Sequence, residues 1–155
     1  MNVGEDGNSL GMPVEGEYEP SPEEWVRKQV ENYERSGGTE DTTLRGVPVV
    51  VVTSRGARSG KVRKNPVMRV EHEGKYAAIG SKGGDPKNPV WVYNLRADPH
   101  VELQDGADKW DMVAREVEGD ERAEWWERGV AAYPDYAAYQ SWTDRLIPVF
   151  VLEPE

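Results

Sequence analysis

Residues 47–53, Val-Pro-Val-Val-Val-Val-Thr, restrict the fold of this chain more than any other segment. Every residue of the run except Pro48 is β-branched, which favours an extended strand over a helix. Apolar side chains occupy both alternating sets of positions, so neither face of the strand is suited to contact with water. The run therefore predicts a central strand covered on both faces, with Pro48 near its start.

Five further extended segments accompany this strand, and short glycine turns join two pairs of them. The segments are residues 62–72, 75–81, 101–104, 109–117 and 145–152. Glu73-Gly74 and Asp105-Gly106 are the turns, as β-hairpins require. A doubly wound parallel sheet needs a crossover helix after nearly every strand, which this pattern lacks. We therefore predict a mainly β fold with flanking helices, built on a six-stranded closed or split β-barrel.

Three helices are expected beside this sheet, at about 21–36, 89–97 and 120–142. The first opens on a capping box, with Ser21 as N-cap, Pro22 at the first helical position and Glu24 closing the box. The third is broken at Pro134, because proline cannot continue the helical hydrogen bonding.

The first 24 residues contain acidic side chains and no Lys or Arg. The acidic residues are Glu5, Asp6, Glu15, Glu17, Glu19, Glu23 and Glu24, in a chain whose net charge is −10. Residues 1–20 have few apolar side chains to bury, so we predict a disordered acidic arm there. Residues 21–155 fit the usual size of one domain, and we assign them to a single barrel domain.

Composition argues against several classes of function. Cysteine is absent and His72 and His100 are the only histidines, so disulfides, thiol catalysis and a zinc centre are all unsupported. An acidic chain lacks the basic surface that general nucleic-acid binding needs. No apolar run reaches the roughly 20 residues that span a bilayer. We therefore expect a cytoplasmic protein without a metal site, with peripheral membrane contact left open.

Positive charge is concentrated between Asp41 and Glu71, where no acidic residue occurs. This basic segment contains Arg45, Arg55, Arg58, Lys61, Arg63, Lys64 and Arg69. Its centre, residues 53–61, is a turn whose amides and guanidinium groups are suited to an anion such as a phosphate. The alternative is a solvated turn whose charges keep a sheet edge from pairing with another chain.

A second segment, residues 80–91, also favours anions. It leaves a strand through glycines and enters a helix, with Asn88 expected as N-cap and Pro89 at the first helical position. The free amides of the helix start and the Lys82 side chain would then face the loop. The spacing of a P-loop and the glycine pattern of a Rossmann nicotinamide site are both missing.

Five ordered blocks resemble the deazaflavin-dependent nitroreductase family. They are residues 81–84, 88–91, 93–95, 97–99 and 139–145, with a framework of Gly56, Gly60, Arg63, Asn65 and Pro66. The resemblance runs from about Trp25 to Pro154. It implies a split β-barrel related to the FMN-binding barrels. It also implies hydride transfer from reduced coenzyme F-420 to a small electrophilic acceptor, such as a nitro compound, a quinone or an enone.

The resemblance also assigns cofactor contacts. Arg58, Ser59, Arg63 and Lys82 would hold the cofactor's phosphate and glutamate tail, and Trp91 would lie against its ring. The full set is Ala57, Arg58, Ser59, Arg63, Lys64, Asn65, Pro66, Val67, Met68, Ile79, Gly80, Ser81, Lys82, Val90, Trp91, Val92, Tyr93, Asn94 and Tyr136.

Tyr133, Tyr136 and Tyr139 are the candidate catalytic residues. The family's corresponding tyrosines line the substrate pocket and hydrogen-bond an acceptor or help deliver a proton. The spacing alone is equally typical of aromatic packing between a terminal helix and the barrel. Met68 stands where better-known nitroreducing relatives can have a tyrosine, so reduction of bicyclic nitroimidazoles does not follow from the resemblance.

Two other functions fit the same residues. One is a related split barrel that uses FMN in place of F-420. The other is a non-catalytic protein that holds the deazaflavin or docks its basic segment on an acidic partner. In each case the chain is expected to be a monomer or a homodimer.

Overall fold

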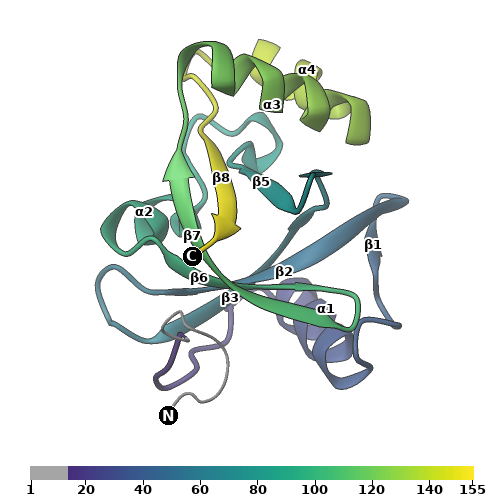
Figure 1. Cartoon of the computed structure of the whole chain (residues 1–155), viewed down its shortest axis with the longest axis vertical. Helices are drawn as coiled ribbons and strands as arrows, with labels where there is room; N and C mark the ends of the chain where they lie inside the picture. Colours follow the sequence, from purple (N-terminus) through teal and green to yellow (C-terminus); the bar gives the residue numbers. More distant parts are fainter. Residues whose placement is uncertain (1–13) are drawn as a thin grey trace.

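A curled antiparallel sheet forms the centre of the protein, in a computed structural model that describes residues 14–155 (Figure 1). The strands are β1 (Thr43–Leu44), β2 (Val47–Arg55), β3 (Val62–Met68), β4 (Glu71–His72), β5 (Lys75–Ile79), β6 (His100–Asp105), β7 (Asp108–Glu116) and β8 (Val149–Pro154). The helices are α1 (Glu24–Arg35), α2 (Val90–Ala97), α3 (Gly119–Ala132) and α4 (Asp135–Ser141), with a 3-10 turn, η1 (Lys82–Gly84).

The long strands follow the order β3, β2, β6, β7, β8, β5, and every pair is antiparallel. β4 pairs with the other edge of β5, where Glu71 lies opposite Tyr76. Because only Arg69 and Val70 separate β3 from β4, one continuous segment pairs with β2 at one end and with β5 at the other. The sheet therefore curls into a barrel, as predicted.

β2 is buried on both faces, which confirms the prediction for residues 47–53. Val49 and Val51 belong to the core between the sheet and the helices α1, α3 and α4. Val50 and Val52 belong to the second core, inside the curled sheet, together with Phe150 and residues of α2. The β-branched run is thus a wall between two apolar cores.

Two predicted strand boundaries are corrected. Residues 62–72 form two strands, because the chain bends at Arg69 and Val70 to change its pairing partner from β2 to β5. The last strand begins at Val149 and not at Arg145, because the paired register with β5 begins at Val149 and residues 145–148 connect α4 to the sheet. The predicted break in the last helix is confirmed, since α3 and α4 are separated at Tyr133 and Pro134.

Both predicted N-caps are also corrected. α1 begins at Glu24, and the Oγ of Ser21 accepts a hydrogen bond from the Glu23 amide (3.1 Å) one turn before the helix. α2 begins at Val90 with Pro89 in the cap position. The Asn88 side chain does not cap the helix and instead accepts a hydrogen bond from Arg145. Every helix within the described residues is too short or too polar to cross a lipid bilayer.

The described part of the acidic arm has a defined path. Its residues 14–20 run beside β3, and Tyr18 forms a parallel bridge with Val62. The Val62 amide donates to the Glu17 carbonyl (2.8 Å), and the Glu19 amide donates to the Val62 carbonyl (2.9 Å). Disorder was predicted for residues 1–20; residues 1–13 lie outside the described residues, and within residues 14–20 the backbone of residues 17–19 pairs with Val62 at the start of β3.

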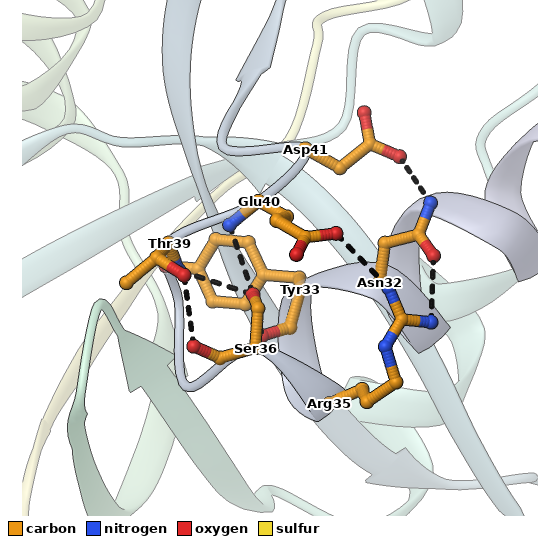
Figure 2. Close-up of polar contacts among 7 residues, drawn as sticks. All are labelled: Asn32, Tyr33, Arg35, Ser36, Thr39, Glu40 and Asp41. Atoms are coloured by element: carbon orange, nitrogen blue, oxygen red, sulfur yellow. Dashed lines mark hydrogen bonds and ion pairs between the residues drawn. The ribbon is translucent and has the colours of Figure 1, made fainter.

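A compact turn fixes the end of α1 (Figure 2). Ser36 donates to the Tyr33 carbonyl (3.2 Å), and its Oγ accepts from the Thr39 and Glu40 amides (3.1 and 2.9 Å). The Tyr33 hydroxyl in turn accepts from the amide of Gly106, in the β6–β7 turn (2.7 Å). These contacts hold α1 on the sheet, and the first turn of α1 reaches the groove described next.

Candidate active site

A groove of about 910 Å³ lies between the start of α1, β3, the β5–α2 connection and α4. That volume is within the range of small-molecule sites. Many of the predicted site residues line it: Arg63, Asn65, Pro66, Val67 and Met68 from β3; Ile79 at the end of β5, and Ser81 and Lys82 after it; Val90, Trp91 and Asn94 from α2; and Tyr133, Tyr136 and Tyr139. The fold therefore brings four separate stretches of the predicted set together.

Other members of the predicted set lie outside the groove wall: Ala57, Arg58, Ser59, Lys64, Gly80, Val92 and Tyr93. The Ala57 amide donates to the Asn94 side chain (2.9 Å), so this turn contacts α2. Lys64 forms an ion pair with Glu34 of α1. A side chain at Gly80 would meet Val92 at 2.8 Å, so Gly80 allows β5 to end close against α2. Ala57, Lys64 and Gly80 thus contact elements that form the walls of the groove.

The two segments that favour anions converge on this groove. Arg63 reaches it from β3, and Lys82 reaches it from η1. Lys82 has a left-handed backbone (φ 46°), as do Gly83 and Gly84 after it (φ 63° and 82°). Such a conformation is costly for a residue with a side chain and persists only where neighbouring contacts impose it. The two cations define the anion end of the groove.

Three tyrosines form an aromatic part of the groove wall. The Tyr133 and Tyr139 hydroxyls are 2.6 Å apart, and the Tyr136 ring packs edge-on against Tyr133 with centroids 5.1 Å apart. All three side chains are buried. Burial raises the pKa of Tyr133 and Tyr136 well above the ordinary value for tyrosine, and the hydrogen bond between Tyr133 and Tyr139 adds to the effect on Tyr133. Near neutral pH the Tyr133 and Tyr136 phenols are protonated hydrogen-bond donors.

The sequence did not reveal every residue of the groove wall. Leu44 and Arg45 reach it from the β1–β2 turn, and Trp25 and Val26 reach it from the first turn of α1. Arg45 belongs to the basic segment, but its place beside the tyrosines depends on how the β1–β2 turn packs in the folded protein. Its positive charge opposes part of the rise in the pKa of Tyr133. Within residues 14–155, no group of three or more His, Asp or Glu side chains could hold a metal ion.

Acidic side chains already contact much of the basic segment. Glu17 and Glu19 of the arm lie 3.6 Å from Lys61 and Arg63, respectively. Glu19 also lines the groove. An anionic ligand that binds Arg63 must therefore do so while the Glu19 carboxylate lies beside the same guanidinium group.

Removing residues 1–20 should tighten the binding of an anionic cofactor about two- to fivefold at low salt, because exposed ion pairs are worth only a fraction of a kcal/mol each. The gain should vanish at high salt, where exposed charges are screened. Fluorescence titration at two ionic strengths measures both effects. The Glu17→Gln/Glu19→Gln variant, which keeps the arm, separates charge from bulk. Equal affinity of full-length and shortened chains at low salt would show that the arm does not compete.

Comparison with known proteins decides the family. Residues 25–154 match the family described as F420H(2)-dependent quinone reductase. The chain belongs to this family. It is therefore an F-420-dependent oxidoreductase, which confirms the predicted enzyme class and cofactor.

Several relatives illustrate the F420H(2)-dependent quinone reductase family. Rv1261c of Mycobacterium tuberculosis, named an F420H(2)-dependent quinone reductase, is 32% identical over 68% of this chain and 72% of its own length. The solved F420-H2 dependent reductase FDR-A is 57% identical, with a TM-score of 0.66 over 68% of this chain and 94% of its own. A structure described as a domain-swapped dimer is 52% identical, with a TM-score of 0.68 over 86% of this chain and all of its own.

More distant structures support the fold alone. The haem-binding protein of Mycobacterium smegmatis (19% identity, 72% of this chain and 48% of its own, TM-score 0.52) has a similar architecture. HutZ of Vibrio cholerae (14% identity, 84% and 90%, TM-score 0.53) has it too. The predicted split-barrel architecture of this F420H(2)-dependent quinone reductase family member is thereby confirmed.

Proposed function

We propose that this protein transfers a hydride from reduced F-420 to a quinone or another small electrophilic acceptor, such as a nitro compound or an enone. One observation carries the proposal: a single groove joins the cations Arg63 and Lys82 to a wall that contains Trp91 and three buried tyrosines. A ligand with a flat ring and an anionic tail matches such a groove, with its tail at the cations and its ring at the aromatic side chains. Family membership supports F-420 over FMN as that ligand.

The residues of the groove fit F-420 by their chemistry. Arg63 and Lys82 would hold its phosphate and glutamate tail through charged hydrogen bonds. Trp91, which packs against Phe150 of the barrel core (centroids 6.1 Å apart), would support the ring. Asn65, Pro66 and the other β3 residues would shape the groove between these two ends. When bound, the reduced cofactor supplies the hydride.

The tyrosines would act on the acceptor. An acceptor that gains a hydride develops negative charge, and a protonated phenol placed beside that charge stabilises it or donates a proton. Tyr133 and Tyr139 share one hydrogen bond, in which one hydroxyl donates its proton and the other accepts it. The accepting hydroxyl can then donate its own proton to a ligand in the groove.

Titration with reduced F-420, followed by single-turnover oxidation with a simple benzoquinone, tests the proposed function. Saturable binding and a faster loss of the reduced-cofactor absorbance than in protein-free buffer are expected. Preferential binding of FMN would replace the proposal with the flavin alternative. Tight binding of F-420 without accelerated oxidation by any quinone, nitro compound or enone would indicate a non-catalytic carrier.

Replacing the tyrosines singly by phenylalanine should lower kcat/KM for at least one acceptor by about tenfold, the effect of one lost hydrogen bond. Tyr136→Phe is the first choice, and Tyr133→Phe and Tyr139→Phe complete the series. Cofactor affinity should stay nearly constant. Tyr76→Phe is a matched control, because its phenol donates to Asp105 (2.6 Å) away from the groove. Normal turnover in all three groove variants would assign the tyrosines to packing.

The assembly and cellular place of the protein remain predictions. The domain-swapped dimer of a relative supports a test of homodimer against monomer by light scattering. The absence of cysteine fits a reducing cytoplasm. Peripheral membrane contact is tested by sedimentation with lipid vesicles.

A further inference from the structure

The loop between β5 and α2, residues 80–89, carries four residues of the groove wall, Ser81, Lys82, Gly83 and Pro89, and part of it has a strained backbone. Ser81 and Lys82 line the groove, and the turn that follows has three consecutive left-handed residues. Within the turn, only the hydrogen bonds from the Gly84 amide to the Ser81 carbonyl (2.9 Å) and from the Asp85 amide to the Lys82 carbonyl (3.1 Å) support it. Contacts from outside the loop must therefore hold Lys82 in its strained backbone conformation.

Arg145, between α4 and β8, makes those contacts. Its Nε donates to the Asp85 carbonyl (2.9 Å), and its Nη2 donates to the Ser81 carbonyl (2.7 Å). Its Nη1 donates to the Gly80 carbonyl (3.1 Å) and to Oδ1 of Asn88 (2.7 Å). One planar guanidinium thus joins the start, the middle and the end of the loop. A lysine ammonium is a compact point charge and cannot reproduce this planar set of donors.

The same connection is fixed to the helix that carries the tyrosines. Gln140 of α4 donates to the Arg145 carbonyl (2.8 Å) and accepts from the Ile147 amide (3.0 Å). Gly84 packs against α4 so closely that an added side chain would lie 3.0 Å from the Tyr139 carbonyl oxygen. The loop with Lys82 and the helix with Tyr139 are therefore held as one unit, with Arg145 at their junction.

We propose that Arg145 is a positioning residue for the anion end of the groove: it holds the 80–89 loop so that Ser81 and Lys82 face the ligand, without contacting the ligand itself. Arg145 stands outside the groove wall, and all four of its acceptors belong to the loop. This inference rests on the proposed function only for the identity of the ligand. The effect on the loop is independent of it.

The binding test compares two ligands, F-420 and its phosphate-free deazaflavin core. Arg145→Gln should weaken F-420 binding about tenfold, the same loss that is expected for Lys82→Ala, and should leave the affinity for the core nearly unchanged. The Arg145→Gln/Lys82→Ala double variant should bind no worse than the weaker single variant, because both changes remove the same contact. Arg115→Gln is the control, since Arg115 makes a comparable set of contacts with Glu121 and Glu153 on the surface.

Two further measurements separate positioning from general stability. Millimolar guanidinium should restore F-420 affinity to Arg145→Ala and not to Lys82→Ala, with equal NaCl as the control. Without any ligand, amide hydrogen exchange at Gly84 and Asp85 should become about tenfold faster in Arg145→Gln, while exchange in β6 and β7 stays unchanged. Should Arg145→Gln fail to fold, Arg145→Lys is measured in the same way.

F-420 affinity within twofold of the unmodified protein, or unchanged exchange at Gly84 and Asp85, would overturn the assignment of Arg145. Equal loss of affinity for both ligands would also overturn it, since a general packing defect does not distinguish the tail from the ring. If the unmodified protein does not bind F-420, the proposed function fails, and the exchange measurement still decides the role of Arg145.

Discussion

Replacing Arg63 and Lys82 together by alanine is expected to weaken F-420 binding by about a hundredfold. Each charged hydrogen bond contributes roughly 1.5–3 kcal/mol, which is about tenfold or more in affinity. The two cations come from β3 and η1, so their contributions should be close to additive. Each single variant should therefore lose about tenfold. Titration of cofactor fluorescence at constant salt measures all three.

The control for this prediction removes the same net charge elsewhere. Arg35 and Lys75 pair with Glu40 and Glu153 on the surface, outside the groove wall, so the Arg35→Ala/Lys75→Ala variant should bind F-420 almost normally. A similar loss in this control would point to the overall charge of the protein. Unchanged affinity in both groove single variants would show that the anion end does not hold the cofactor.

Gly38→Ala should lower the free energy of unfolding by about 3 kcal/mol or more, the size of a severe steric defect. Gly38 has a left-handed backbone (φ 79°), and an added Cβ would lie 2.2 Å from the Gly106 carbonyl oxygen. Neither backbone can easily move apart, because the Tyr33 hydroxyl holds the Gly106 amide and the Tyr33 carbonyl holds the Gly38 amide (2.8 Å). Urea unfolding measures the loss.

Gly37→Ala is the matched control. Gly37 is also left-handed (φ 66°), but its added Cβ would meet nothing within 4 Å. The cost there is only that of a left-handed alanine, about 1 kcal/mol. If both variants lost the same stability, the contact between the end of α1 and the β6–β7 turn would contribute little.

Local chemistry explains which parts of the fold the sequence could predict. The β-branched residues of β2 and the turn at Glu73-Gly74 determine their own conformation through steric preference and turn geometry, and both were predicted. The second glycine turn lies at residues 106–107, one residue later than predicted, because Asp105 pairs with Asp108. The bend at Arg69 and Val70 was missed, because it depends on β5 being present as a second pairing partner. The same is true of Asn88, whose side chain is bound by Arg145 from 57 residues away.

The candidate site shows a similar division. Arg63 and Lys82 were singled out by charge and glycine spacing, and both line the groove. Arg58 and Ser59 were expected beside them, but they lie in the turn beyond the end of the groove wall. Charge in a sequence does not tell which side of a hairpin a turn residue faces. The acidic arm likewise pairs with β3 through backbone contacts that its composition does not predict.

The position of β8 in the sheet has a consequence for the order of folding. β8, the last strand within the described residues, lies between β7 and β5 and is therefore an inner strand of the barrel. Tyr76 pairs with Leu152, which is far away in the sequence. Such pairing forms slowly, because the chain loses the entropy of closing a long loop before the stabilising contacts form. The β2–β3 and β6–β7 hairpins are local and can form during synthesis. The groove, whose tyrosines and β5 residues are joined through β8, is therefore completed only after synthesis has passed residue 152.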